Sequence, residues 1–214
     1  MSAQARDTIL GRIRTNLKKG PGLTGPPPAV RIAPPRVAPE AYVASFKERL
    51  EALAGRVHHV AQPEEALAIV QGIIGDKSTV ASNAPILARC GITRLGNVQS
   101  GFTDAASLKE ASAQAEYGIT SADFALAETG TLVMLSSHEE ARMASLVPVR
   151  HIAVVETARL LSGLDELLGR LERPNDQTAS MVLITGPSRS ADIEQILVRG
   201  VHGPGEVTVI FVGP

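Results

Sequence analysis

The stretch HIAVVE, residues 151–156, decides the fold class, because its centre from Ile152 to Val155 is continuously apolar. A strand that buries only one face alternates between apolar and polar residues, so a continuous run indicates a strand buried on both faces. A second such run, EVTVIFV, occupies residues 206–212, and segments with helical periodicity separate these runs from shorter apolar ones. We therefore predict an α/β fold with a mainly parallel sheet flanked by helices.

The remaining elements are predicted from periodicity, caps and breakers. Helices are expected at residues 40–55, 62–75, 84–91, 107–114, 162–172 and 191–200, with a partly helical loop at 139–148. Strands are expected at residues 57–60, 78–82, 92–98, 119–136 and 179–186, besides the two runs above. Asn83 and Ser162 are expected to cap the helices that follow them, and Gly55 to end the first helix.

Residues 1–40 differ in composition from the rest of the chain. Ile9, Leu10, Ile13 and Leu17 share one face of a basic amphipathic helix, and residues 20–40 contain 7 of the 14 prolines. We predict a helical arm and a proline-rich linker at 1–40, followed by an α/β domain at 41–214. The arm packs on its own domain or on a second copy in a homo-oligomer; a membrane surface or another protein is the alternative.

The linker begins with GPGLTG, residues 20–25, which matches the dinucleotide-binding pattern of glycines. That pattern needs a strand before it and a helix after it, whereas here a helix precedes and three prolines follow. We interpret it as linker.

Composition excludes several classes of protein. A formal net charge of −1 and 3% aromatic residues without Trp argue against nucleic-acid binding, and no apolar run is long enough to span a membrane. With one cysteine, Cys90, the chain forms no internal disulfide and holds no iron–sulfur cluster by itself. A reducing compartment, the cytoplasm, is expected.

Ligands of parallel sheets collect where the carboxyl ends of the strands lead into loops. Three predicted edges carry suitable residues: Ser82 and Asn83; Glu128, Thr129, Gly130 and Thr131; and Gly186, Ser188, Arg189 and Ser190. We predict a ligand site built from these loops.

Glu128 stands out as an acid in ADFALAETGTLVMLSS, residues 122–137. Burial raises the pKa of a carboxyl unless N–H groups or a cation hold the charged form. In one interpretation Glu128 is a nucleophile, general base or hydrogen-bond acceptor for a substrate, with Thr129 and Thr131 orienting it. In the other, it is a solvated or paired acid at a strand end.

The loop TGPSRSADIE, residues 185–194, has the parts of an anion-binding site: small hydroxyls, an arginine and a predicted helix N-terminus. The alternative is ordinary helix capping by Ser188 or Ser190. Among the histidines, His202 in a glycine-rich turn is the best functional candidate. None has a second ligand at metal spacing, so no metal site is predicted.

Three segments together resemble the LUD domain family, and within it the lactate utilisation protein C subfamily: GITSADFALAETGTLVML, LVPVRHIAVV and GPSRSADIEQILVRGVHGPGEVTVIFV. The resemblance covers residues 41–214 and implies a fold similar to the sugar-isomerase and CoA-transferase superfamily. It also implies a role in oxidising L-lactate to pyruvate with iron–sulfur partner proteins, which would carry the cofactors. Whether Glu128 matches the acyl-accepting glutamate of CoA transferases is left open.

Two functions therefore follow from the sequence. The first is a non-redox component of an L-lactate utilisation system that binds a small anionic ligand. The alternative is a stand-alone enzyme, similar to CoA transferases or isomerases, acting on an acyl or phosphorylated small molecule.

Overall fold

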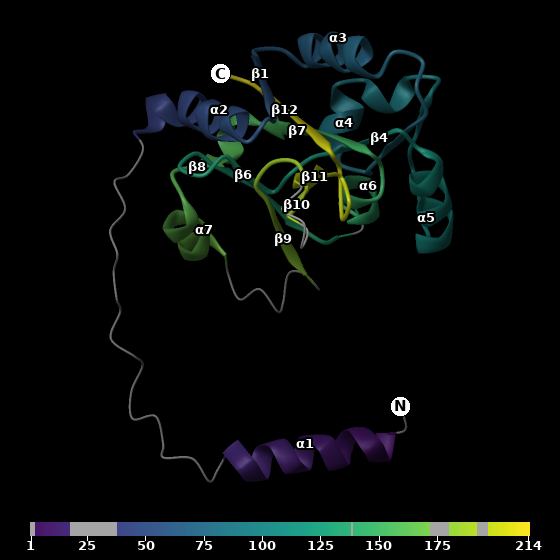
Figure 1. Cartoon of the computed structure of the whole chain (residues 1–214), viewed down its shortest axis with the longest axis vertical. Coiled ribbons are helices and arrows are strands. Elements are labelled where there is room, and N and C mark those ends of the chain that lie inside the picture. The colour runs from purple at the N-terminus through teal and green to yellow at the C-terminus, as the bar shows by residue number, and fades with distance from the viewer. Residues whose placement is uncertain (1–2, 18–37, 138, 172–179, 192–196) are drawn as a thin grey trace. The chain divides into compact units, whose positions relative to one another are not determined.

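In the computed structural model, six parallel strands form the central sheet, in the order β1-β12-β7-β4-β2-β3 (Figure 1). The structure describes residues 3–17, 38–137, 139–171, 180–191 and 197–214. The strands of this sheet are β1 (Arg56–Val60), β2 (Thr79–Ala81), β3 (Val98–Gln99), β4 (Tyr117–Thr120), β7 (Arg150–Glu156) and β12 (Glu206–Val212). The predicted α/β class with a mainly parallel sheet is confirmed.

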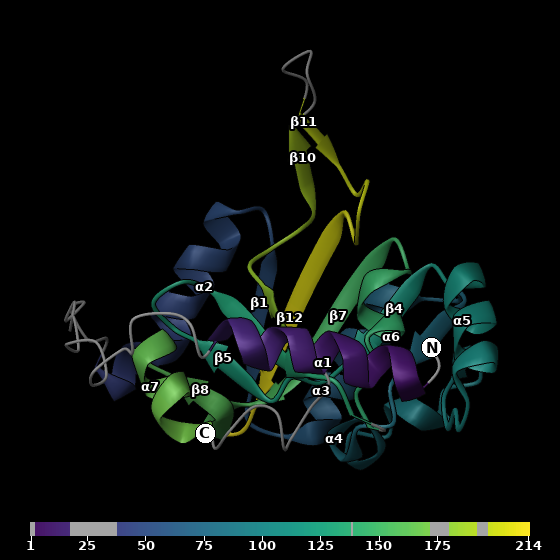
Figure 2. The ribbon, with the colours of Figure 1, turned by 90° about the horizontal axis from the view of Figure 1, so that it is seen from below.

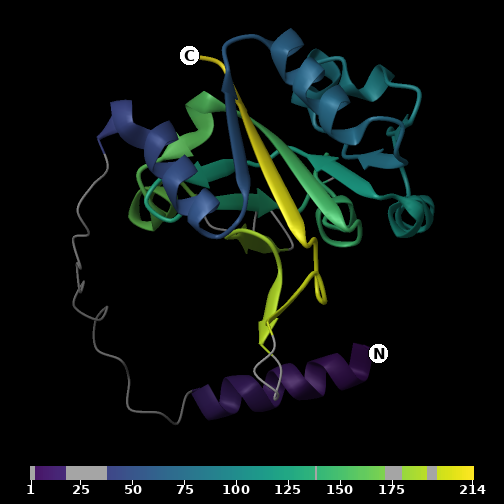
Figure 3. The ribbon, with the colours of Figure 1, turned by 45° about the horizontal axis from the view of Figure 1, so that its top comes forward.

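The two continuous apolar runs occupy the middle of the sheet. β12 pairs with β7 on one side and with β1 on the other, so it lies between them (Figure 3). In β7, Ile152 and Val154 belong to the core on one face, and Ala153 and Val155 to the core on the opposite face. Burial on both faces is the reason that the run is continuous rather than alternating.

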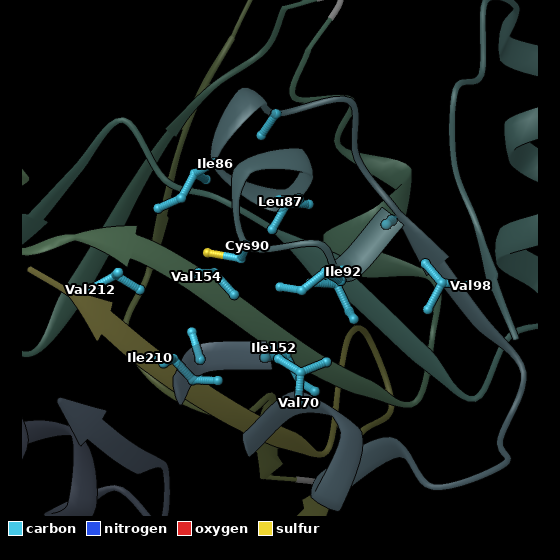
Figure 4. Close-up of a cluster of buried hydrophobic side chains, with 14 of the residues drawn as sticks. Val70, Ile86, Leu87, Cys90, Ile92, Val98, Ile152, Val154, Ile210 and Val212 are labelled. Atoms are coloured by element: carbon cyan, nitrogen blue, oxygen red, sulfur yellow. The ribbon is translucent and has the colours of Figure 1, made fainter. Parts of the chain in front are cut away.

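One face of the sheet is covered by α3 (Pro63–Ile74) and α4 (Pro85–Arg89). Figure 4 shows Ile86, Leu87 and Cys90 above the side chains of Ile152 and Val154. α3 begins with a capping box between Gln62 and Glu65, which satisfies backbone donors at the helix start.

The other face is covered by helices and by a second, four-stranded sheet. The helices are α2 (Tyr42–Ala52), α5 (Ala105–Gln114) and α6 (Met143–Leu146). Phe46 of α2 packs edge-on against Phe211 of β12, with ring centroids 4.9 Å apart. Gly55 packs against α2, since a Cβ there would lie 2.5 Å from Cγ of Leu50. The preceding residue, Ala54, takes the left-handed conformation, with a φ of 65°.

The second sheet corrects the prediction of one strand over residues 119–136. Its order is β8-β5-β6-β9, formed by β8 (Leu160–Leu161), β5 (Phe124–Leu126), β6 (Thr131–Leu135) and β9 (Met181–Ile184). β5 and β6 are antiparallel and joined by a turn in which Gly130 has a φ of 66°. Within the segment 119–136, only the residues of β4 belong to the central parallel sheet. The chain leaves this sheet after Thr120 and reverses its direction at Gly130.

The predicted helix over residues 191–200 is wrong in its described part. β10 (Arg189–Ala191) and β11 (Leu197–Arg199) pair as an antiparallel hairpin, which projects from the central sheet in Figure 2. Residues 192–196 lie outside the described residues. Short apolar runs such as Ile-Leu-Val are compatible with either a helix or a strand, so pairing decides between them.

Three further local predictions need correction. The segment 92–98 is a short 3-10 helix, Ile92–Arg94, before the two residues of β3. α7 (Leu164–Arg170) has Gly163 at its N-cap position instead of Ser162. α4 has Ala84 at that position instead of Asn83, whose side chain is engaged elsewhere.

Contacts divide the chain into Met1–Pro34 and Pro35–Pro214. In the first unit the predicted helix is present as α1 (Ala3–Leu17), with the side chains of Ile9 and Ile13 exposed. Most of the predicted linker, including GPGLTG, falls in residues 18–37, outside the described residues. Among the helices that the structure describes, none has the length and apolar character needed to cross a bilayer.

Candidate functional site

The order of the parallel strands places a topological switch point between β2 and β4. These strands are neighbours, but the chain leaves β2 for β3 on one side and leaves β4 for β7 on the other. Diverging connections open a crevice beyond the carboxyl ends of the two strands, where open α/β sheets bind ligands. This edge is therefore the candidate site.

Ser82 and Asn83 follow β2 at this edge, as predicted. Ser82 is buried and its N–H donates to the carbonyl of Ile119 in β4. The amide of Asn83 donates to the carbonyl of Phe102 over 2.7 Å and accepts from the N–H of Gly101 over 2.9 Å. Asn83 thus orders the loop before α5 instead of capping α4.

Glu140 is the buried acid of the site, and the sequence prediction missed it. Its side chain is only 6% exposed. Oε1 accepts hydrogen bonds from the N–H of Ser121, after β4, over 2.7 Å and from Oγ of Ser82 over 3.2 Å. Oε2 has no hydrogen-bond partner among the described residues. The carboxyl therefore joins the ends of both strands at the switch point and leaves one oxygen available.

The environment of Glu140 favours its neutral form. Burial raises the pKa of Glu140 to about 7, with smaller contributions from the charges of Asp123 and Glu139, while the hydrogen bonds from Ser121 and Ser82 oppose the rise. Both protonation states are consequently populated near neutral pH. A turn places this side chain, since Oγ of Ser137 accepts from the N–H groups of Glu139 and Glu140.

Two cavities flank this carboxyl group. The first cavity, of about 240 Å³, is mainly apolar and is lined by Ser82, Asn83, Phe102, Leu108, Met143 and Glu139, among others. The second cavity, of about 190 Å³, lies at the carboxyl ends of β4 and β7 and includes Ser121, Asp123, Glu140, Glu156, Arg89 and Arg159 in its lining. The first cavity suits an apolar group and the second a charged one.

The second cavity contains a cluster in which two arginines share one carboxylate. Arg89 contacts Glu156 at 2.6 Å and Arg159 contacts it at 3.4 Å. The hydrogen bond from Arg89 is the largest of the effects that lower the pKa of Glu156, so this carboxylate stays charged. Burial raises the pKa of the nearby Asp123, whose carboxylate accepts from the N–H of Leu135 over 2.7 Å.

Glu128 does not lie at the edge of the central parallel sheet, which corrects the predicted location. It lies in the β5–β6 turn of the second sheet, and its Oε1 accepts from the N–H of Leu164, the first residue of α7, over 3.1 Å. An acid at a helix start is stabilised by free N–H groups and by the helix dipole. This contact matches the interpretation of a paired acid, and a catalytic role for Glu128 stays a prediction.

The other residues of this turn are also explained by packing. The hydroxyls of Thr129, Thr131 and Thr185 form a chain with distances of 2.7 and 2.9 Å, which ties the turn to the end of β9. A Cβ at Gly130 would lie 2.7 Å from the backbone nitrogen of Leu50. The AETGT segment therefore meets Thr185, the residue before GPSRS, and the contact does not involve Glu128 or Arg189.

The GPSRS loop leads into a strand, so it lacks the helix N-terminus on which its predicted anion site depended. Gly186 has a φ of 90° and packs beside Leu53, to whose carbonyl the guanidinium of Arg189 donates. The backbone of Ser188 pairs with Pro204 and Gly200. Neither this loop nor the Glu128 turn lines the two cavities.

The remaining residues of the predicted site lie away from the switch point. The side chain of Ser190 lies outside the described residues, although its backbone belongs to β10. His202 is exposed in the segment between β11 and β12. Among the described residues, no group of three or more His, Cys, Asp or Glu side chains is arranged to hold a metal ion.

His151 is a second buried polar residue that the sequence prediction did not single out. It is fully enclosed in β7, and its Nε2 lies 2.8 Å from Oγ1 of Thr120, the last residue of β4. Burial lowers the pKa of His151 to about 4, so the ring is neutral at physiological pH. This pair joins β7 to the end of β4, the strand that precedes Ser121.

Comparisons with known proteins agree with this fold. The model of the LUD domain matches residues 43–212. The chain is 40% identical over 114 residues to "Lactate utilization protein C" of Halalkalibacterium halodurans, covering 51% of this chain and 50% of that protein. It is 41% identical over 103 residues to the protein of that name in Bacillus subtilis, covering 46% and 43%. These alignments span about half the length of the curated relatives.

A solved structure resembles the chain more extensively at lower identity. A DUF162 family protein from Deinococcus radiodurans superposes with a TM-score of 0.62 and 20% identity, covering 83% of this chain and 99% of that one. At this identity the likeness concerns the fold alone. The match of the family model over most of the chain decides the classification: the chain belongs to the LUD domain family.

Proposed function

We propose that this protein takes part in lactate utilisation and that it does so by binding a small carboxylic acid in the second cavity. The observation that carries the proposal is the identity of about 40% to relatives named lactate utilization protein C. L-Lactate and pyruvate are the acids that such a system would present.

The chemistry of the second cavity supports an anionic ligand. Arg89 and Arg159 together carry two positive charges and share the single carboxylate of Glu156. A guanidinium binds carboxylates through parallel N–H groups, and each of these two has donors beyond its contact with Glu156. Acids line both cavities, with Asp123, Glu139 and Glu140 also in the wall of the second, but only the second has arginines in its lining, so it is the one that offers cations to an anion.

Electron transfer is assigned in this proposal to iron–sulfur partner proteins. Iron–sulfur clusters are held by several cysteine thiolates, whereas this sequence contains only Cys90. Cys90 is buried in the core, and burial raises the pKa of its thiol, which disfavours the thiolate that ligates metals. The chain would then be the component that binds the acid and not the component that carries electrons.

The test is a binding screen by thermal shift and isothermal titration calorimetry, with L-lactate, D-lactate, pyruvate, acetate, acetyl-CoA and nucleotides. A ligand that binds the folded state raises the melting temperature by mass action. L-Lactate or pyruvate should stabilise the wild type, and Arg159→Ala should weaken that binding about tenfold or more. Arg94→Ala, at an exposed arginine outside both cavities, is the matched control and should leave binding unchanged.

Two results would contradict the proposal. One is stabilisation by acetyl-CoA but by none of the small acids, lost in Glu128→Gln, which would favour the acyl-transferring alternative. The other is acid binding that is equally strong in wild type and Arg159→Ala, because the second cavity would then not be the site.

A further inference from the structure

The two oxygens of Glu140 are in different situations. Oε1 accepts from the N–H of Ser121 and from Oγ of Ser82, while Oε2 has no partner among the described residues. A buried polar atom without a partner costs free energy, so such atoms in folded proteins are normally completed by water or a ligand. Glu140 belongs to the lining of the second cavity, so a molecule bound there is the candidate partner of the buried Oε2.

The hydrogen bonds also decide which oxygen carries the proton of the neutral acid. Oε1 accepts from the N–H of Ser121 and, with the hydroxyl of Ser82 as the donor, from Oγ of Ser82 as well. In this arrangement the proton of the neutral acid resides on Oε2, which makes Oε2 a donor. A donor at this position requires an acceptor on the ligand, and a carboxylate is the strongest acceptor that a small acid offers.

The acids around Glu140 also favour its neutral form. Asp123 and Glu139 are the acids that face it, and the guanidiniums of Arg89 and Arg159 lie in the same cavity, both paired with Glu156. The nearby His151 is neutral, because burial lowers its pKa to about 4. An ionised Glu140 would add a further negative charge beside an incoming anion, whereas a neutral Glu140 would not.

Resting on the proposed function, we infer that Glu140 binds the ligand carboxylate as a neutral acid through Oε2, so that the anion and one proton enter the site together. Glu140 is thereby a binding residue whose protonation selects for carboxylic acids. The bound pair is an O–H···O⁻ hydrogen bond, and no covalent bond forms or breaks.

Because anion binding is coupled to the uptake of a proton, the affinity for the ligand should depend on pH. Only the protonated form of Glu140 donates to the anion, and its fraction falls as pH rises through the pKa, which burial raises to about 7. The affinity for pyruvate and L-lactate should be constant at low pH and fall about tenfold per pH unit above the pKa.

The experiment is calorimetric titration of the full chain with pyruvate and with L-lactate from pH 5.5 to 8.5. Each titration is repeated in buffers of different ionisation enthalpy, which counts the protons taken up. Wild type should take up close to one proton per anion at pH 8 or above and almost none at pH 5.5. This count is made on wild type and so does not depend on how well a variant folds.

Two variants locate the proton. Glu140→Gln keeps an acceptor for Ser121 and Ser82 and presents a permanent N–H donor, so it should bind the acids without proton uptake and with a flat pH profile. At pH 8 and above it should bind more tightly than wild type. Glu110→Gln, at an exposed acid of α5 outside both cavities, is the matched control and should retain the proton uptake of wild type.

The outcomes separate the two proposals. If wild type binds pyruvate or L-lactate without proton uptake, or if Glu140→Gln retains the wild-type pH slope, this inference is overturned and the proposed function stands. If neither acid binds at any pH, both are overturned.

Discussion

The backbone N–H of Leu164 donates a hydrogen bond of 3.1 Å to the carboxylate of Glu128, so an acid in the β5–β6 turn holds the first residue of α7. Gly163 lies beside this contact, and a Cβ there would be 2.1 Å from Oε1 of Glu128. The acid that is conspicuous in the sequence thus has a structural partner 36 residues later.

Gly163→Ala is expected to displace the Glu128 carboxylate and lower the free energy of unfolding by about 1–3 kcal/mol, because the new methyl group occupies its place. Glu128→Ala should cost about 1 kcal/mol, the usual value for a lost helix cap. Urea denaturation of each variant measures these changes. The control is Gly169→Ala, within α7 and with open space around it, which should stabilise by about 0.5–1 kcal/mol. Equal effects at both glycines would contradict the steric explanation.

Gly118 of β4 permits the close approach of α6 to the sheet. A Cβ at this position would lie 1.8 Å from the carbonyl oxygen of Ala144, which is backbone and cannot move aside. Gly118→Ala should therefore destabilise the protein by about 3 kcal/mol or more, measured by thermal and urea unfolding. Gly72→Ala, inside α3 with nothing within 4 Å, serves as the comparison and should be neutral or stabilising. A mild Gly118→Ala variant would show that α6 shifts freely.

Glu140 should make stability depend on pH even without a ligand. Its pKa rises from the ordinary value of 4.5 to about 7 on folding, so the folded state binds more protons than the unfolded state between these values. The contribution of this group is fully present below pH 4.5 and is lost as pH rises through 7, by about 3 kcal/mol at most.

Comparing Glu140→Gln with wild type isolates this contribution, because other titrating groups are common to both proteins. The difference in unfolding free energy should shift in favour of the variant between pH 5 and pH 8, as followed by urea denaturation at each pH. A difference independent of pH would mean that the folded-state pKa of Glu140 is ordinary.

Cys90 should be unreactive in the folded protein. Its side chain is buried among Ile86, Leu87 and Val154, and burial raises the pKa of the thiol (Figure 4). A thiol reagent such as dithionitrobenzoate should therefore react slowly in native buffer and with one equivalent in denaturant. The rate at which Cys90 reacts at intermediate urea concentrations reports how readily the core beneath α4 opens. Rapid labelling without denaturant would contradict this burial.

Much of the architecture could be predicted because it depends on periodicity within single segments. Continuous apolar runs identified β7 and β12, and amphipathic patterns with Pro63 or Gly75 at their ends delimited α3. The predictions for the segment 119–136 and for the described part of 191–200 are wrong, because an apolar run does not say whether it continues, reverses or pairs with another strand. In the first, the positive φ of Gly130 makes the reversal; in the second, β10 and β11 pair with each other.

The residues of the site show the same difference between what local sequence predicts and what the fold decides. Ser82 and Asn83 were located correctly, because a strand end is visible in the sequence. Glu128 is conspicuous among its apolar neighbours along the chain, yet in the fold it contacts the start of α7. Glu140 was overlooked in the polar segment SSHEEAR, residues 136–142, where nothing local indicates burial.

The sequence is sufficient to predict the fold class, the two central strands, the covering helices before residue 115 and the family resemblance, because these depend on residue order over short distances. Only the tertiary structure decided that β4 and β2 diverge at a switch point and that Glu140 is buried between Ser82 and Ser121. The physical reason is that desolvation and hydrogen bonding, which set the charge of a carboxyl group, come from neighbours in space and not from neighbours along the chain.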